Sequence, residues 1–231
     1  MSRATRVALA GVLCCAGVVL PSAVDAQQRV SFPTSDGGTV YADLYGSGDH
    51  AVVLAHGGRF NKESWKAQAE TLAGAGFRVL AVDFRGYGQS RGPGDTDVMT
   101  APLHLDVLGA VHWLRASGAR TVSAIGGSLG GGASAEAVVA EPGAIDRLVL
   151  LGSETGDSPE KLTGRKLFIL SRDDADGSGT LRLTRIREQY DRTPEPKELI
   201  LLDGSAHAQF IFGTDQGARA MRAILRFLTA P

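Results

Sequence analysis

Cysteine is scarce in this sequence, and neither sign of charge dominates it. The only two cysteines of the 231 residues, Cys14 and Cys15, are adjacent and lie near the N-terminus. The rest of the chain therefore has no thiol for a disulfide, a thiolate metal site or a cysteine nucleophile. Lys and Arg number 24 against 25 Asp and Glu, so the formal net charge is −1. The missing basic excess argues against a nucleic-acid-binding protein, and the 43% of hydrophobic residues argues against a disordered one.

Long apolar runs are also rare, and the one that stands out is at the N-terminus. Arg3 and Arg6 precede the apolar stretch Val7–Leu20, and the small residues of Val24-Asp25-Ala26 follow it. This order is typical of a secretory signal peptide, and the stretch is shorter than the roughly 20 residues that cross a bilayer as a helix. We predict a signal peptide over Met1–Ala26, an exported protein that is periplasmic or secreted, and no stable membrane insertion after cleavage. An uncleaved N-terminal anchor is the alternative interpretation.

From residue 27 to residue 231 the sequence alternates between two kinds of segment, which indicates a single domain. Short apolar runs with β-branched residues are typical of strands buried on both faces, and longer runs with apolar residues at helical steps are typical of helices. The predicted strands are 39–44 (after a hairpin at 36–38), 51–55, 77–84, 121–125, 147–151, 166–170 and 198–202, and the predicted helices are 61–75, 97–116, 128–140, 180–190 and 216–228. This alternation predicts a doubly wound, mostly parallel α/β sheet with helices on both faces.

The clearest motif follows the predicted strand 121–125. Ligands bind beyond the carboxyl ends of the strands in such sheets, and Gly126-Gly127-Ser128-Leu129-Gly130 has the pattern G-x-S-x-G at that position. A nucleophilic serine on a sharp strand-to-helix turn needs this context, and glycines at 126 and 130 avoid collisions around it. The helix N-terminus directs free N–H groups at a developing anion, so Leu129 N–H is a predicted oxyanion donor. By itself, the motif also fits an ordinary glycine-rich turn.

A second glycine-containing segment, His56-Gly57-Gly58-Arg59, follows the predicted strand 51–55. Glycine allows the backbone to approach a substrate oxygen closely. We predict the N–H of Gly58 as the second oxyanion donor, with the N–H of Arg59 as the alternative. His56 is interpreted as a structural histidine that bonds to nearby backbone, and it is given no catalytic role.

An acidic segment follows the predicted strand 166–170. A carboxylate at this position could orient a histidine and stabilise it when protonated. Asp174 is the predicted acid, with Asp173 and Asp176 as alternatives, and a solvated acidic turn is the interpretation without function. A calcium loop does not fit, because the register that puts Gly177 at the sixth position puts Arg172 at the first.

A histidine lies in the glycine-containing segment 203–207 after the last predicted strand. His207 is the predicted base, because a residue at the end of this strand could reach back to the serine. The other histidines are interpreted as surface or packing residues. His50 lies in a polar turn, and His104 and His112 share one helix at a spacing that is not that of metal ligands.

Ser128, Asp174 and His207 follow three different strands in the order serine, acid, histidine, an order that belongs to one fold. With 56–58 and the stretch Asp83-Phe84-Arg85-Gly86-Tyr87-Gly88-Gln89-Ser90, they make the sequence resemble the α/β-hydrolases from about residue 39 to 228. The resemblance implies an eight-stranded, mainly parallel sheet. It also implies Ser128 as nucleophile, Asp174 as acid and His207 as base, with Arg85 in a structural turn.

Two departures narrow this resemblance. The link 152–165 is short and leaves little room for a helical lid, so the chain is most similar to compact, lidless members such as dienelactone hydrolases and small esterases. Many dienelactone hydrolases resemble it in size but use a cysteine nucleophile. A serine at 128 speaks against the haloalkane dehalogenases and epoxide hydrolases of the same fold, which carry an aspartate there.

The sequence therefore predicts a serine hydrolase that cleaves a carboxylic ester of modest size through an acyl-enzyme. Its partner is a small-molecule ester or amide, no nucleic acid is expected, and the reaction requires no cofactor or metal. A serine exopeptidase or aminopeptidase would use the same triad on an amide. A non-catalytic secreted binding protein on a hydrolase scaffold is the alternative from another class, because a fold alone does not guarantee chemistry. The oligomeric state stays open.

Overall fold

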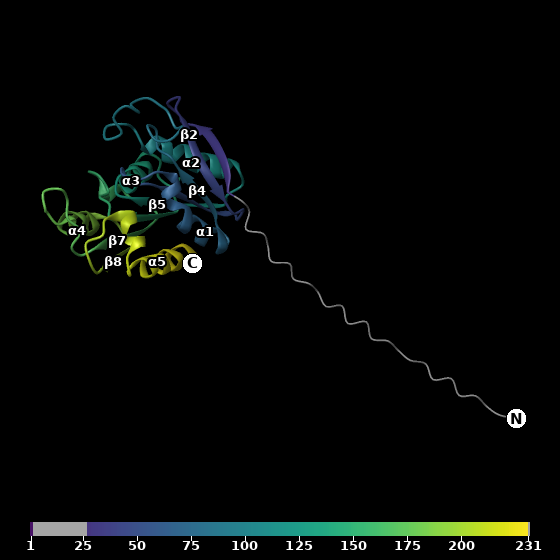
Figure 1. Cartoon of the computed structure of the whole chain (residues 1–231). Helices are drawn as coiled ribbons and strands as arrows, with labels where there is room; N and C mark the ends of the chain where they lie inside the picture. Colours follow the sequence, from purple (N-terminus) through teal and green to yellow (C-terminus); the bar gives the residue numbers. More distant parts are fainter. Residues whose placement is uncertain (2–26, 231) are drawn as a thin grey trace.

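The structure, a computed structural model, describes Met1 and residues 27–230 of the chain (Figure 1). The predicted signal peptide lies outside the described residues except for Met1, so cleavage and export stay predictions. The strands are β1 (Gln28–Pro33), β2 (Thr39–Tyr45), β3 (His50–Ala55), β4 (Arg78–Val82), β5 (Thr121–Gly127), β6 (Arg147–Leu151), β7 (Arg165–Ser171) and β8 (Lys197–Leu202). The α-helices are α1 (Lys66–Gly74), α2 (His104–Ala116), α3 (Leu129–Ala140), α4 (Arg182–Arg192) and α5 (Gly217–Thr229), and the 3-10 turns are η1 (Lys62–Trp65), η2 (Pro159–Lys161) and η3 (Ala208–Gly213).

Most predicted elements are present, and the main differences concern where helices begin. The helix predicted from 97 starts only at His104, because Pro102 has no N–H and disfavours helical backbone at the residue before it. Residues before it form turns in which Asp97 O accepts the N–H groups of Thr100 and Ala101. The helix predicted from Ser128 starts one residue later, because Ser128 has a positive φ.

The eight strands form one sheet in the order β1-β2-β4-β3-β5-β6-β7-β8. The strand β2 pairs antiparallel with both β1 and β4, and every other pair is parallel. The prediction of a doubly wound, mostly parallel eight-stranded sheet is therefore confirmed. The hairpin predicted at 36–38 is also present, and it joins β2 to the edge strand β1.

Helices cover both faces of the sheet, and the strands bury alternate residues in two separate cores. Along β3, Ala51, Val53 and Ala55 pack with residues of α2 and α3, and Val52 and Leu54 pack with α1 and α5 on the other face. Figure 1 shows α2 and α3 together on one side and α1 and α5 on the other. A strand buried on both faces explains why the sequence of β3 is a continuous apolar run rather than an alternating one.

The parallel pairing brings the ends of several strands to one edge of the sheet. Ala55 at the end of β3 pairs with Gly126, and Gly127 at the end of β5 pairs with Leu151. Ser171 at the end of β7 pairs in the same way with Leu202, the last residue of β8. The segments that follow these strands therefore meet at the carboxyl edge, which is where ligands bind in such sheets.

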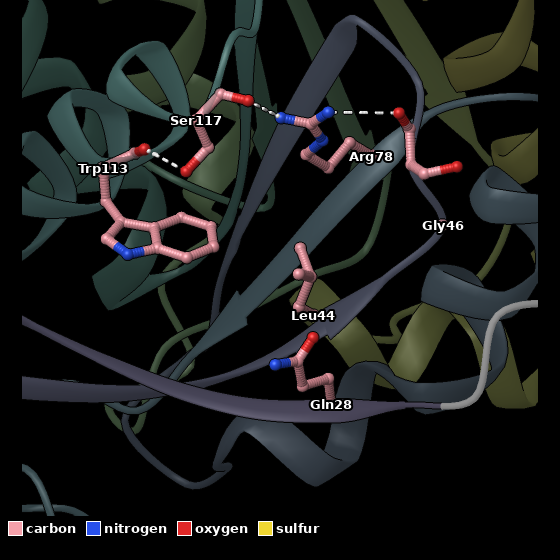
Figure 2. A pocket seen from close by; sticks show the side chains of 7 residues that line it. Gln28, Leu44, Gly46, Arg78, Trp113 and Ser117 are labelled. Carbon is pink, nitrogen blue, oxygen red and sulfur yellow. Dashed lines mark hydrogen bonds between the residues drawn. The ribbon is translucent and has the colours of Figure 1, made fainter.

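A cavity of about 410 Å³ lies at the opposite, amino edge (Figure 2). Its lining includes Arg78 at the start of β4 and Ser117 after the end of α2. The Arg78 guanidinium donates to the backbone oxygens of Ser117 and Ser47, so its charge is already held by the protein. This position separates the cavity from the segments that follow the parallel strands.

No helix among the described residues combines the length and the apolar character needed to cross a membrane.

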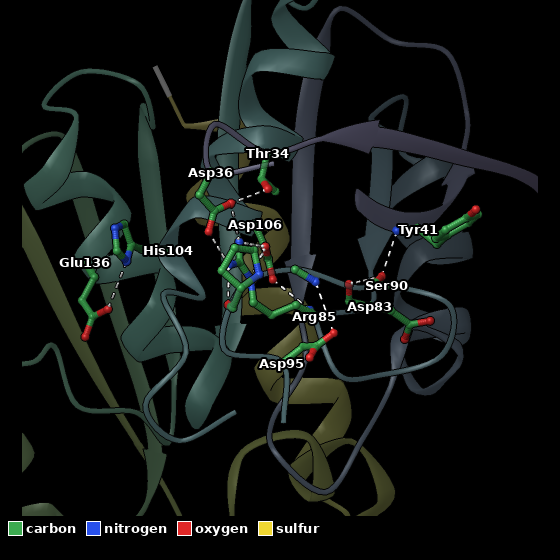
Figure 3. A network of polar contacts seen from close by, with 12 residues as sticks. Thr34, Asp36, Tyr41, Asp83, Arg85, Ser90, Asp95, His104, Asp106 and Glu136 are labelled. Atoms are coloured by element: carbon green, nitrogen blue, oxygen red, sulfur yellow. Dashed lines mark hydrogen bonds and ion pairs between the residues drawn. The ribbon is translucent and has the colours of Figure 1, made fainter. Parts of the chain in front are cut away.

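A buried ion cluster supports the loop that follows β4 (Figure 3). The Arg85 side chain has no exposed surface, and its Nε and Nη2 donate to Asp106 Oδ1 at 2.9 and 2.6 Å. Its Nη1 donates to Asp36 Oδ2 at 2.5 Å and to Pro93 O at 3.0 Å. The hydrogen bond from the Arg85 guanidinium lowers the pKa of Asp36 to about 2, because its effect outweighs that of burial, which raises the pKa. Arg85 is thus structural, as the sequence predicted.

Replacing Arg85 with methionine tests this cluster. The Asp106 carboxylate would stay buried without its partner, so Arg85→Met should lower the free energy of unfolding by about 3–5 kcal/mol. Urea denaturation at neutral pH measures the change. Arg226→Met is the control, because Arg226 pairs with Glu198 at an exposed position and such pairs contribute about 1 kcal/mol or less. Equal losses in the two variants would contradict the assignment.

Candidate active site

Ser128 stands at the turn between β5 and α3 with a backbone conformation that is uncommon for any residue but glycine. Its φ is 49° and its ψ is −115°. Such strain persists only where the surroundings impose it. Here, Ser128 N–H donates to Leu151 O at 3.0 Å, and Ser128 O accepts from Ser153 Oγ at 2.7 Å. The end of β6 and the segment after it therefore hold the turn in place.

Glycines at 126 and 130 allow the turn to form, as the sequence predicted. A Cβ on Gly126 would overlap the backbone of Gly130 and Gly131, and a Cβ on Gly130 would overlap the carbonyl of Ala55 at the end of β3. The first turn of α3 is therefore in direct backbone contact with the loop after β3. This contact brings the serine turn and the segment 56–59 together.

The substitution Gly130→Ala is expected to disrupt the turn. Overpacking in a close-packed region costs typically 1–3 kcal/mol, and here the obstacle is backbone, so Gly130→Ala should lower the free energy of unfolding by at least about 2 kcal/mol. Gly132→Ala is a matched control two residues on, because its Cβ would have Glu154 O at 3.9 Å as its nearest neighbour. Alanine should stabilise that helical position by about 0.5–1 kcal/mol. Thermal denaturation that moves both variants in the same direction would contradict the steric argument.

The three side chains predicted to act together form one hydrogen-bonded chain. His207 Nε2 lies 2.8 Å from Ser128 Oγ, and His207 Nδ1 lies 2.7 Å from Asp174 Oδ2. A carboxylate can only accept, so Nδ1 carries the proton and Nε2 is left as the acceptor of the serine hydroxyl. Asp174 is 1% exposed, and its second oxygen lies 3.5 Å from Arg182 Nε. The geometry allows the imidazole to take a proton from the hydroxyl.

The alternative acids lie elsewhere. Asp173 is exposed, and its N–H donates to Gly204 O. Asp176 Oδ1 accepts from Ser178 and Thr180 within its own loop, and these hydrogen bonds hold the pKa of Asp176 below its ordinary value. The structure brings Asp174, and neither of these two, to His207.

The two predicted oxyanion donors lie on adjacent segments. Leu129 is the first residue of α3, where backbone N–H groups lack intrahelical partners. Gly58 is exposed, and a Cβ placed on it would be 3.6 Å from the Leu129 side chain. Gly58 O accepts from the Tyr87 hydroxyl at 2.8 Å. A carbonyl oxygen beside Ser128 could therefore meet N–H groups from both segments, and the choice between Gly58 and Arg59 stays a prediction.

His56 is buried and belongs to the support of this loop, as the sequence predicted. Its Nδ1 donates to Gly57 O at 2.9 Å, and its Nε2 accepts from Phe84 N–H at 3.3 Å. Burial lowers the pKa of His56 to about 4. The imidazole is therefore neutral at pH 7, and both of its ring nitrogens are bonded to backbone groups.

This pKa shift predicts a specific dependence of stability on pH. Between pH 6.5 and pH 4 the unfolded chain protonates His56 and the folded chain does not, so the free energy of unfolding should fall as pH decreases. The loss should total about 3 kcal/mol, at about 1.4 kcal/mol per pH unit. His56→Gln lacks this titration, so its stability relative to the unsubstituted chain should improve from pH 7 to pH 4. Urea denaturation at several pH values measures the two free energies of unfolding. An equal change with pH in both proteins would contradict the pKa shift.

The remaining histidines and acids of the described part of the chain form no metal site. His112 Nε2 contacts Glu141 at 3.0 Å, His104 Nδ1 lies 3.7 Å from Glu136, and His50 Nδ1 contacts Thr121. Within residues 27–230, no group of three or more His, Cys, Asp or Glu side chains is arranged to hold a metal ion.

Gln209 is a residue of the site that the sequence did not predict. Gln209 is 6% exposed, and its Oε1 accepts the N–H of Gly57 at 2.7 Å. The two residues are 152 positions apart, and Gln209 lies in the short 3-10 turn η3, just outside the predicted segment 203–207. No local sequence signal could therefore have identified this contact.

Comparison with known proteins identifies the family to which this fold belongs. The profile of the alpha/beta hydrolase fold family matches residues 50–213. This chain therefore belongs to the α/β-hydrolase family, and the resemblance inferred from the sequence is confirmed.

Curated relatives match only part of the chain. An epoxide hydrolase from Caballeronia sordidicola is 39% identical over 71 residues, which cover 30% of this chain and 21% of the relative. A non-heme chloroperoxidase from Streptomyces lividans is 35% identical over 130 residues, which cover 52% of this chain and 43% of the relative. The chain thus spans less than half of the length of either protein.

Solved structures match nearly the whole described domain. An esterase from Pyrococcus furiosus is similar with a TM-score of 0.71 and 20% identity, over 87% of this chain and 91% of the esterase. A dienelactone hydrolase from Anabaena variabilis is similar with a TM-score of 0.71 and 18% identity, over 87% of this chain and 95% of the hydrolase. At these identities the likeness establishes the fold.

Proposed function

We propose that this protein is a serine hydrolase that cleaves a carboxylic ester of modest size. The observation that carries the proposal is the chain of two short hydrogen bonds from Ser128 Oγ through His207 to the buried Asp174. A serine hydroxyl is a weak nucleophile because it stays protonated at neutral pH. An adjacent, oriented base activates it by taking the proton.

In the proposed reaction, Ser128 Oγ attacks the ester carbonyl while its proton passes to His207 Nε2. The N–H groups of Leu129 and Gly58 would bind the oxyanion, and loss of one such donor typically costs about 3 kcal/mol of transition-state stabilisation. His207 then protonates the leaving alcohol, and Ser128 keeps the acyl group. A water deprotonated by the same imidazole releases the acid and restores the hydroxyl. Asp174 holds the imidazole tautomer and stabilises its protonated form.

The surroundings of the triad favour a modest substrate with an apolar part. Between β6 and β7 the chain forms only the single turn η2, so no helical lid covers the site from there. Phe60 follows the 56–59 segment and Phe210 follows His207, and their rings pack with centroids 4.8 Å apart. Phe210 is 48% exposed. This aromatic pair offers an apolar surface beside the loops that carry Gly58 and His207.

Replacing the serine tests the proposal. Ser128→Ala should lower kcat for a p-nitrophenyl ester of a short acid by at least about 10³-fold, because the nucleophile is lost. Steady-state kinetics measure kcat, and circular dichroism checks that the fold is intact. Ser178→Ala, in an exposed loop, is the control and should keep the original rate. Wild-type turnover by Ser128→Ala would exclude the mechanism.

The same preparation separates the alternatives. Short aminoacyl amides compared with short acyl esters distinguish an exopeptidase from an esterase. A fluorophosphonate probe that labels the unsubstituted protein and not Ser128→Ala excludes the non-catalytic binding protein, because only an activated serine reacts.

A further inference from the structure

Gln209 joins three segments of the candidate site through one carboxamide. It lies in η3, two residues after His207. Its Oε1 accepts from Gly57 N–H at 2.7 Å, and its Nε2 donates to Ser64 Oγ at 2.7 Å in η1. A backbone N–H can only donate, so the oxygen end of the amide must face Gly57.

The hydrogen bond to Gly57 matters because the segment 56–59 has little rigidity of its own. Two successive glycines follow His56, and glycine restricts φ and ψ less than any other residue. Each peptide unit is planar, so fixing one of its polar groups fixes the direction of the other. The Gln209 carboxamide fixes the N–H of the peptide between residues 56 and 57.

The next peptide unit carries the predicted oxyanion donor. Gly57 O accepts from His56 Nδ1 at 2.9 Å and from Phe60 N–H at 2.9 Å. Because that carbonyl is held, the Gly58 N–H of the same planar unit points the opposite way. Gln209 thus fixes the peptide unit before Gly57, and His56 and Phe60 fix the unit after it. Together these contacts set the direction of Gly58 N–H.

Packing places the same carboxamide against the serine turn. A Cβ on Gly127 would lie 2.9 Å from Gln209 Oε1, and a Cβ on Gly57 would lie 3.4 Å from it. The side chain therefore lies between the segment that offers Gly58 N–H and the residue that precedes Ser128. An apolar residue at position 209 would leave the Gly57 N–H buried without an acceptor, which is unfavourable.

We propose that Gln209 is a positioning residue that holds the Gly58 N–H in the direction an oxyanion requires. This inference rests on the proposed ester hydrolysis at Ser128. Gln209 acts through the backbone and touches neither the nucleophile nor the reacting carbonyl, so its substitution should lower kcat more than it changes KM.

Comparison of an ester with its thionoester tests the inference. Sulfur is larger than oxygen and a weaker acceptor, so a well-placed oxyanion site should hydrolyse the oxygen ester faster. Gln209→Met should lower kcat for the oxygen ester on the order of tenfold and lower the oxygen-to-sulfur rate ratio on the order of tenfold, with KM within about threefold. Gln189→Met is the matched control. It removes two similar bonds, to Thr155 N–H and Gly156 O, and should leave the ratio unchanged.

A thermal transition shows whether Gln209→Met folds. If it does not fold, a second variant, Ser64→Ala, tests the inference. Ser64→Ala alters a half-buried position and frees one end of the carboxamide, so the ratio should fall by about two- to threefold. An unchanged ratio in whichever variant folds would overturn the inference and leave the proposed function standing. Absence of Ser128-dependent hydrolysis in the unsubstituted protein would instead overturn the proposed function, and this inference with it.

Discussion

The close approach of the start of α3 to the end of β3 is the constraint on which the rest of the site depends. Backbone touches backbone at Gly126, Gly130 and Ala55, in space that a methyl group would fill. This contact places Ser128 in its strained conformation at the tip of the turn. It also places the first N–H groups of α3 next to the segment 56–59. A larger residue at these glycines would separate Ser128 from both sets of neighbours.

Parallel strand pairing supplies the remaining partners of the serine. Because β5, β7 and β8 run in the same direction, the segments after them meet at one edge, although Ser128 and His207 are 79 residues apart. The acid is buried and the histidine is partly exposed, so the carboxylate is shielded while the imidazole can reach a substrate. The carboxylate and the imidazole thus have different environments, which suit the proposed proton transfers.

Buried polar groups give these loops their shape. Arg85 with Asp106 holds the loop after β4, and Tyr87 of that loop donates to Gly58 O. Neutral His56 and the Gln209 carboxamide hold Gly57 from two sides. Since each of these groups is satisfied by backbone, by a hydroxyl or by an opposite charge, burial is tolerated. These contacts therefore hold the loops that follow β3 and β4 in place.

The sequence alone predicted the class of sheet, the strand that precedes Ser128 and the chain order of Ser128, Asp174 and His207, because apolar runs and G-x-S-x-G are local patterns. It also indicated that the serine turn needs glycine at 126 and 130, and that His56 and Arg85 have structural roles. It placed the start of α2 too early, since Pro102 outweighed the apolar periodicity. The sequence preferred Asp174 but left Asp173 and Asp176 open as alternatives. Only the tertiary structure placed Asp174, and neither alternative, against His207, and only it placed Gln209 against Gly57. Those contacts join residues far apart in the chain, and the packing of loops at the sheet edge decides them.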